Sequence, residues 1–219
     1  MIGKGKSISH GTAALEYDLA KEIDGQTAAI EIARHELYGC TGAEMVQEMK
    51  PYHADFPNVK NNCLRFEVSP SIEESATFTD ADWAELGNDF MQRMGLANHQ
   101  YIIIRHSGTE SKKEQAHLHI LANRVSLSGE LYRDNWIGKK ATEAANAIAK
   151  ERNFVQSQDI GKANKAEIKE AMDGVLKKMQ GFDLTKFKEE LGKRGFKVRE
   201  ARASTGKLNG YYVTARSGT

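Results

Sequence analysis

The chain has 219 residues, 40% of them apolar and 28% charged, and its 31 Lys and Arg nearly balance its 30 Asp and Glu. Such a composition is that of a globular protein with a buried core, and it excludes a disordered chain. No apolar run approaches the ~20 residues that cross a bilayer, and the first residues carry no signal-peptide stretch, so we expect a cytoplasmic protein without a membrane segment.

The first third of the chain alternates between strand and helix patterns. We expect, in chain order, a short strand at residues 6–9, a helix at 12–22, a partly ordered helix followed by a turn at 25–42, and a helix at 43–49. Thr41 and Glu44 have the spacing of a capping box at the start of the last helix, and Pro51 ends it. Tyr17 falls in the middle of the 12–22 helix.

The middle of the chain predicts an antiparallel core. Residues 63–69 alternate apolar and polar side chains, as a half-buried strand does, and residues 79–94 form an amphipathic helix that begins with an N-capping Thr79. Residues 101–105 and 117–125 are two further strands. The polar segment between them is too short for a helical crossover, so these two strands form a hairpin.

The last third is mostly helical and closes with a second hairpin. We expect helices at residues 139–151, 164–179 and 183–193, and strands at 196–203 and 209–214. Strands and helices mixed on an antiparallel sheet define an α+β fold with the helices gathered on one face or at one end of the sheet.

The charge is unevenly distributed along the chain. Residues 1–130 carry 12 basic and 19 acidic side chains, a net −7, whereas residues 131–219 carry 19 and 11, a net +8. From Lys193 onward, seven basic residues stand against one acidic residue, Glu200. Such a region suits a polyanionic partner, and the alternative is a basic face that contacts only solvent.

Three histidines lie where the predicted hairpin brings them together. Side chains alternate along a strand, so His117 and His119 point to the same face. His106 ends the preceding strand and would lie beside His117, within roughly 5 Å. Three neutral imidazoles are a sufficient ligand set for a divalent cation that keeps open positions for water or substrate. The arrangement suits catalysis more than structure.

Other residues of similar chemistry lack such a relation. A histidine on a strand is usually a hydrogen-bonded polar side chain, and we give that role to the remaining four: His10, His35, His53 and His99. The two cysteines, Cys40 and Cys63, are too few for a disulfide framework and have no zinc-type spacing, so we expect them to pack as small apolar residues. Asn123 either orients a ligand or caps its strand.

A metal site of this kind acts on phosphoryl or carbonyl substrates through one of two nucleophiles. One is a metal-bound water, which gives hydrolysis, and the other is a side-chain hydroxyl, which gives a covalent intermediate. Tyr17 is the candidate hydroxyl, because it lies mid-helix beside acidic residues rather than within an apolar run. The alternative is a tyrosine that only occupies the surface of an amphipathic helix.

The order of these motifs resembles that of a known family. An early helix with Tyr17, a strand with Phe-Glu67-Val, and then His106 and His117-x-His119 are similar to the relaxases of mobilizable plasmids and transposons, the MobA/MobP-type branch of the HUH single-strand endonucleases. The opening Gly-Lys-Ser-Ile-Ser-His is similar to mobilization proteins of Bacteroides-type elements.

The resemblance implies a fold and a domain organisation. The fold is a palm-like antiparallel sheet of about five strands with helices packed on one face. Residues 1–135 would be the catalytic relaxase core, and residues 136–219 a helical and basic hairpin extension of the same domain that contacts DNA.

It also implies a reaction. His106, His117 and His119 would hold Mg²⁺ or Mn²⁺, and Tyr17 would attack one DNA strand at a plasmid or transposon transfer origin, oriT. The product is a 5′-phosphotyrosyl bond that can be rejoined, and the nick initiates conjugative mobilization. Glu67 stands where related enzymes have an acidic residue that assists the metal or its histidines, and its alternative role is that of an exposed strand residue.

Partners follow from the same resemblance. They are single-stranded or hairpin origin DNA and, beyond DNA, an accessory mobilization protein and a conjugative coupling protein. DNA recognition would fall to the basic carboxy-terminal part, where Phe196, Tyr211 and Tyr212 offer rings for base stacking or for the core. The candidate DNA-binding residues are Lys193, Arg194, Lys197, Arg199, Arg202 and Lys207.

Several alternatives stay open. Tyr38, Tyr52 and Tyr132 are further tyrosines, and His10 is a contender because some sister families use a histidine as nucleophile. Another reading is a rolling-circle replication initiator of the same superfamily, whose tyrosine usually follows the histidine pair. A metal-dependent hydrolase that uses activated water and a DNA-binding module without catalysis are the other two readings.

Overall fold

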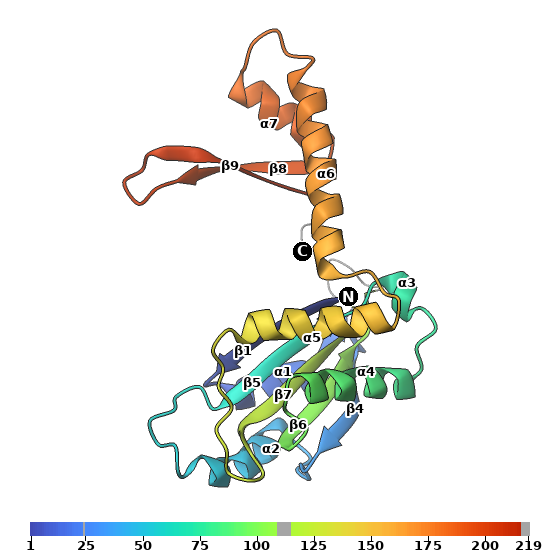
Figure 1. The fold of residues 1–219 in the computed structure, drawn as a ribbon, viewed down its shortest axis with the longest axis vertical. Coiled ribbons are helices and arrows are strands. Elements are labelled where there is room, and N and C mark those ends of the chain that lie inside the picture. The colour runs from blue at the N-terminus through green and yellow to red at the C-terminus, as the bar shows by residue number, and fades with distance from the viewer. Residues whose placement is uncertain (24, 109–114, 216–219) are drawn as a thin grey trace. The chain divides into compact units, whose positions relative to one another are not determined.

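The computed structural model describes residues 1–23, 25–108 and 115–215, and these form two compact units (Figure 1). The first unit runs from Met1 to Ser157 and the second from Gln158 onward. The division of the chain at residue 135 into a catalytic core and a DNA-contacting extension stays a prediction. Within the described ranges, no helix is long and apolar enough to span a membrane.

A five-stranded antiparallel sheet forms the centre of the first unit, in the order β1-β5-β7-β6-β4 (Figure 1). The predicted α+β class, the 63–69 strand and the hairpin of the two histidine-bearing strands, β6 and β7, are confirmed. The bounds of the strands are Ile2–Ile8 (β1), Ala29–His35 (β4), Cys63–Ser69 (β5), His99–His106 (β6) and His117–Ser126 (β7).

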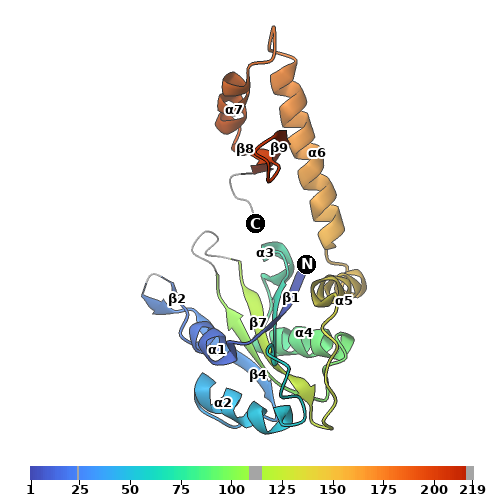
Figure 2. The same ribbon diagram turned by 90° about the vertical axis from the view of Figure 1, so that its left-hand side faces the viewer.

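Helices cover both faces of this sheet rather than one (Figure 2). The central strands are apolar on both faces: Ile103 and Ile120 pack against α4 and α5, while Ile102 and Leu121 pack against α1 and α2. Because both faces of the sheet are apolar, each needs a layer of helices to cover it. The prediction that the helices lie on one face only was therefore wrong in this respect. The helices are α1 (Gly11–Leu19), α2 (Gly42–Met49), α4 (Asp80–Arg93) and α5 (Ile137–Glu151).

The prediction of a helix within residues 25–42 was wrong, because this segment contains the strand β4. It pairs with β6 at the edge of the sheet, and a β-bulge lies between Glu31 and Ala33. The bulge interrupts the strict alternation of side chains, and an edge strand needs few buried residues, so the strand period is hidden in the sequence. The preceding helix also ends early, at Leu19, before a small ribbon of Glu22–Ile23 (β2) and Gln26–Thr27 (β3).

Capping residues set several helix starts as predicted. Thr41 and Glu44 form the capping box of α2, and Thr79 caps α4. Of the two cysteines, Cys63 is buried on β5 as expected, whereas Cys40 is exposed because it lies in the turn before α2. A short 3₁₀ helix, Lys50–His53, follows α2.

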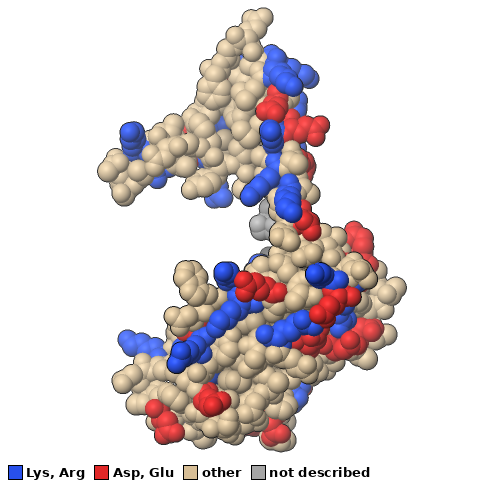
Figure 3. All heavy atoms as spheres, viewed as in Figure 1, with Lys and Arg blue, Asp and Glu red and all other residues tan. Residues whose placement is uncertain are grey.

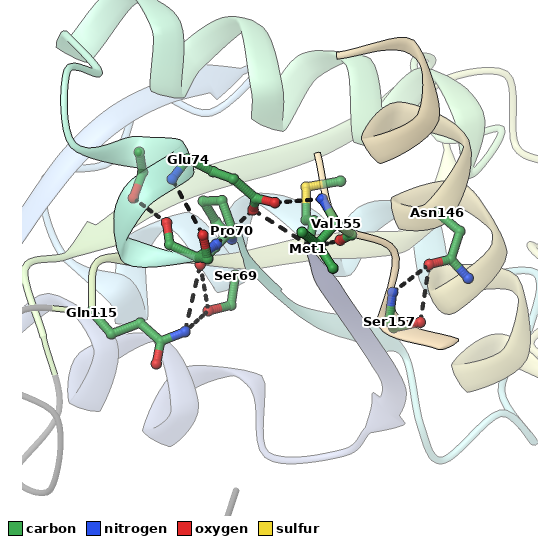
Figure 4. A network of polar contacts seen from close by, with 10 residues as sticks. Met1, Ser69, Pro70, Glu74, Gln115, Asn146, Val155 and Ser157 are labelled. Atoms are coloured by element: carbon green, nitrogen blue, oxygen red, sulfur yellow. Dashed lines mark hydrogen bonds and ion pairs between the residues drawn. The ribbon is translucent and has the colours of Figure 1, made fainter. Parts of the chain in front are cut away.

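Glu74 joins three segments at the end of the sheet where β1 begins and β5 ends (Figure 4). It belongs to the short helix α3, Ile72–Ser75, and accepts the backbone N–H of Ser71 at 2.7 Å. It also accepts the backbone N–H of Val155 at 2.6 Å and pairs with the amino group of Met1 at 3.6 Å. The start of β1 and the segment after α5 are thereby held together.

The second unit is a helical pair with a hairpin. Ala171 and Val175 of α6, Phe187 and Leu191 of α7, and Phe196 of β8 form its core. The predicted helices and hairpin are confirmed, although the long helix begins and ends earlier than expected. The bounds are Ser157–Leu176 (α6), Leu184–Lys193 (α7), Phe196–Arg202 (β8) and Leu208–Ala215 (β9).

Close packing of α5 on β1 depends on glycine. A Cβ at Gly3 would lie 2.6 Å from the Cβ of Ala145 and would also meet the carbonyl oxygen of Ala141. The hydroxyl of Thr142 donates to the carbonyl oxygen of Gly3 at 3.1 Å. We therefore expect Gly3→Ala to lower the free energy of unfolding by about 1–3 kcal/mol, because the helix must move away from the strand.

Urea denaturation of the purified chain measures this effect. Gly138→Ala is the matched control, since a Cβ there has its nearest neighbour, the carbonyl oxygen of Gly5, at 3.5 Å. We expect the control to change stability by less than ~1 kcal/mol. Equal stabilities of wild type and Gly3→Ala would refute the packing argument.

Candidate metal and nucleophile site

The three predicted histidines converge at one end of the β6–β7 hairpin. His106 and His117 are paired across the two strands, and His119 follows on the same face of β7. The ring centroids of His106 and His119 are 4.4 Å apart, and those of His117 and His119 are 4.9 Å apart. One ring nitrogen from each of the three lies within 4.8 Å of the others. The predicted convergence is therefore present in the structure.

Burial favours the neutral form of two of these rings, the form that binds a cation. Desolvation lowers the pKa of His106 to about 4 and that of His119 to about 2, and the neighbouring imidazoles add to both shifts. Both rings are neutral at pH 7, so each has a nitrogen lone pair. A set of neutral imidazoles fits a divalent transition-metal cation by its donor chemistry.

Two carbonyl oxygens orient the rings. The backbone oxygen of Asp18 accepts a hydrogen bond from Nε2 of His106 at 2.7 Å. The backbone oxygen of Gln115 accepts one from Nδ1 of His117 at 3.1 Å. Contacts of this kind to the nitrogen away from a metal are typical of histidine ligands, because they set the tautomer and the ring orientation.

Asp18 is the residue that the sequence interpretation missed. It is 1% exposed and binds the guanidinium of Arg65, with Nε of Arg65 donating to Oδ2 at 3.1 Å. Its Oδ1 lies 3.8 Å from Nδ1 of His119. Burial raises the pKa of Asp18, and the hydrogen bond from Arg65 opposes this shift. A signal existed: Asp18 shares the buried helical stripe with Ala14 and Leu15.

Tyr17 precedes Asp18 on α1 and points away from that stripe. Its side chain is 59% exposed. Nζ of Lys21, one turn later, lies 3.5 Å from its hydroxyl oxygen and 5.6 Å from its ring centroid. Because the next residue contacts His106 through its backbone, the peptide that carries Tyr17 borders the histidine cluster. The structure thus brings the helix of Tyr17 to the site and leaves its hydroxyl on the surface.

Glu67 lies directly across from His119, on β5. Its carboxylate binds Nζ of Lys4 at 3.0 Å rather than a histidine. An open pocket of about 210 Å³ covers this part of the sheet, and its lining includes Glu67, His119 and Lys6. The pocket leaves the histidine cluster accessible from the side of β1 and β5.

The remaining histidines lie outside the cluster, within the described residues. Asn123 is fully buried and joins two of them: its Oδ1 lies 2.8 Å from Nε2 of His53, and its carbonyl oxygen lies 2.9 Å from Nδ1 of His99. Asn123 also donates to the side chain of Gln100 at 3.0 Å. These contacts give Asn123 a structural role in fastening the 3₁₀ helix to the sheet.

The predicted DNA-binding residues all belong to the second unit, and they differ in their contacts. Lys193 pairs with Glu190, Arg202 pairs with Glu200, and Arg194 donates to the carbonyl oxygen of Ala171. Figure 3 shows Lys and Arg side chains on the hairpin, whereas along α6 they are mixed with Asp and Glu. Three are exposed without an ion pair among the described residues: Lys197, Arg199 and Lys207.

Comparison with known proteins gives a family and distant structural similarities. The family model described as relaxase, MobA/VirD2-like, nuclease domain matches residues 17–154. The conjugative relaxase TrwC in complex with oriT DNA is similar in its metal-free structure (TM-score 0.41, 11% identity) and its metal-bound structure (TM-score 0.37, 14% identity). Each comparison covers 94% of this chain and 74% of the solved chain. No curated protein sequence matched the chain.

Removal of one ring should weaken cation binding. We expect His106→Ala and His119→Ala each to reduce Mn²⁺ affinity by at least the ~10–100-fold that loss of an outer-shell partner costs, because one of three nitrogen donors is missing. Isothermal titration calorimetry measures the affinity. His10→Ala is the control, since His10 is exposed and lies outside the cluster. Unchanged affinity in both variants would show that the cluster is not the cation site.

Proposed function

Because this chain belongs to the MobA/VirD2-like relaxase family, we propose that it nicks and rejoins one DNA strand at a transfer origin through a covalent tyrosyl intermediate and so initiates conjugative mobilization. The observation that carries the proposal is the convergence of His106, His117 and His119 within 4.8 Å, beside the helix of Tyr17 and within the matched range. With three protein ligands, a bound cation would keep further positions open for a phosphate.

The three histidines hold a divalent cation in this proposal. The cation is Mg²⁺ or Mn²⁺, and the all-imidazole donor set favours Mn²⁺ of the two, because Mg²⁺ prefers oxygen ligands. A bound divalent cation polarises the scissile phosphate and stabilises negative charge on its oxygens. The chain's contribution is to keep the rings of His106 and His119 neutral through burial, and to orient the rings of His106 and His117 through the carbonyl oxygens of Asp18 and Gln115.

Tyr17 supplies the nucleophile. Its oxygen attacks phosphorus, the bond to the 3′ oxygen of the preceding nucleotide breaks, and the strand is left with a free 3′-hydroxyl and a 5′-phosphotyrosyl bond. The phenol must lose its proton during attack, and the ammonium group of Lys21 stabilises the negative charge that develops on the oxygen. The linkage conserves the phosphodiester energy, so the 3′-hydroxyl can reverse the reaction.

The open pocket beside His119 is where the DNA strand approaches the site. Lys4 and Lys6 provide positive charge for its phosphates, and Glu67 assists the cation or its histidines from the neighbouring strand. To do so, Glu67 must leave its ion pair with Lys4. A DNA phosphate that binds Lys4 would favour this change, because it replaces the carboxylate as the partner of the ammonium group. The accessory mobilization protein and the coupling protein that the family resemblance implies stay proposals of the same kind.

DNA recognition involves the second unit, and its outer hairpin face suits this task. The face comprises Lys197, Arg199, Tyr212 and Thr214, where Arg199 is paired with Tyr212 across the strands. Tyr212 is 64% exposed, whereas Phe196, on the opposite face, belongs to the core. An exposed ring between cations provides stacking for unpaired bases and neutralisation for phosphates. Arg194, which is bound to α6, is a structural residue by its contact.

Tyr17→Phe should abolish both nicking and the covalent adduct on an origin-containing oligonucleotide, because the substitution removes the attacking oxygen. A denaturing gel resolves the nicked strand, and mass spectrometry identifies the tyrosine joined to DNA. Tyr38→Phe is the matched control, since Tyr38 is also exposed but lies before α2. Full nicking by Tyr17→Phe would favour a hydrolase with activated water, and an adduct on Tyr132 would favour the replication-initiator arrangement.

Substitution on the outer hairpin face should weaken DNA binding without stopping catalysis. Tyr212→Ala should cost about 1–3 kcal/mol of binding free energy, because base stacking is lost. Arg199→Ala should reduce the slope of log affinity against log salt concentration by about 1, because one phosphate contact is lost. Fluorescence anisotropy with a labelled single strand at several salt concentrations measures both. Lys162→Ala is the control, because Lys162 pairs with Asp159 on α6. Wild-type affinity and salt slope in both variants would exclude this face.

A further inference from the structure

Hydrogen bonds assign the proton on each of the two rings of the His-x-His pair. The Nε2 atoms of His117 and His119 lie 3.1 Å apart, so one must donate and the other accept. Nδ1 of His117 lies 3.1 Å from the carbonyl oxygen of Gln115, which only accepts, so the proton of His117 is on Nδ1. His119 is therefore the donor between the rings, with its proton on Nε2.

The contact at Nδ1, the other ring nitrogen of His119, supports this assignment. Nη2 of Arg65, which can only donate, lies 3.3 Å from Nδ1 of His119. This nitrogen is therefore an acceptor, as a ring with its proton on Nε2 requires. The same guanidinium binds the carboxylate of Asp18, and Oδ1 of Asp18 lies 3.8 Å from the same Nδ1. Arg65 and Asp18 thus compete for one nitrogen and favour opposite tautomers of His119.

The tautomer decides whether the two rings can share a cation. A proton on Nε2 of His119 points toward Nε2 of His117, where a cation shared by both atoms would lie. Ligation through this atom requires a lone pair on it. The proton on Nε2 must pass to water while Nδ1 takes a proton from water, so the ring stays neutral and no proton is released overall. Oδ1 of Asp18, which lies 3.8 Å from Nδ1, then has to move within hydrogen-bond distance to accept the new N–H. Arg65 disfavours this tautomer, because its own N–H would face the proton on Nδ1.

We propose that Asp18 and Arg65 are a positioning pair that sets the tautomer of His119, with Arg65 opposing and Asp18 supporting cation binding. The inference rests on the proposed cation site. Asp18 touches two of the three ring systems, because its backbone oxygen also holds His106 at 2.7 Å. Asp18, which directly follows Tyr17, thus contacts both His106 and His119. It shares the role that the sequence assigned to Glu67, the support of a histidine ligand by a carboxylate.

Nitrogen-15 NMR of the full chain with labelled histidine tests the tautomer directly. Before titration we expect the protonated nitrogen of His119 to be Nε2, and on addition of Zn²⁺, a diamagnetic probe, we expect it to be Nδ1. His99 is the internal control: its Nδ1 faces the carbonyl oxygen of Asn123 outside the cluster, so its tautomer should not change. A proton on Nδ1 of His119 before Zn²⁺ is added would overturn the proposal.

Variants give a second, independent measurement. Asp18→Asn should lower Mn²⁺ affinity about 10–100-fold, because a neutral amide is a weaker acceptor for the ring N–H. Arg65→Gln should leave Mn²⁺ affinity equal to or higher than that of wild type, with His119 protonated on Nδ1 without metal. Arg124→Gln is the control, since Arg124 pairs with Asp134 away from the cluster.

The outcomes separate the two proposals. Wild-type Mn²⁺ affinity in Asp18→Asn would overturn the positioning role and leave the proposed function intact. Absence of Mn²⁺ and Zn²⁺ binding in wild type would overturn the cation site and, with it, both proposals. If Asp18→Asn fails to fold, the NMR assignment of His119 in the wild-type chain decides alone, because it needs no substitution.

Discussion

A single buried carboxylate holds the site together. An isolated charge in the interior is costly, so Asp18 has to be paired, and Arg65 on β5 provides the pairing. This ion pair fixes α1 to the sheet one turn beyond its apolar contact, Leu15. Together with the apolar contacts of Ala14 and Leu15, this ion pair holds α1, and Tyr17 on its surface, against the sheet. Asp18 therefore connects the helix that carries Tyr17 both to β5 and to His106 of the histidine cluster.

The sheet makes the cluster rigid. All three histidines belong to strands rather than to loops, and the apolar residues near them on these strands, Ile104, Leu118 and Ile120, are buried. Side chains on packed strands are held more accurately than side chains on loops, which suits a ligand set that must keep its geometry. Helices on both faces provide this packing. On β1 and β5, one face is covered by α5, and the pocket lies on the face that carries Lys6, Glu67 and, on the neighbouring strand, His119.

Local patterns predicted most of the elements and the histidine cluster. The β5 strand and the β6–β7 hairpin were predictable because their alternation is strong and the connection is short, and register then places His106 beside His117. β4 was not, because its bulge interrupts the alternation. Asp18 and Arg65 are 47 residues apart in the chain, and no local period reveals such a pair. The catalytic role of Tyr17 and the DNA contacts of the second unit stay predictions, since they depend on a ligand.

The glycines of β1 have a consequence for solubility. Strands at the margins of a sheet expose free amides and carbonyls that can recruit a strand from another chain. At one margin α5 lies against Gly3, and the hydroxyl of Thr142 occupies a backbone oxygen there. At the other margin the bulge of β4 and the charged pair of Glu31 and Arg34 disrupt a straight template. Both margins are thus protected, and the fold resists the strand addition from which fibrous aggregates grow.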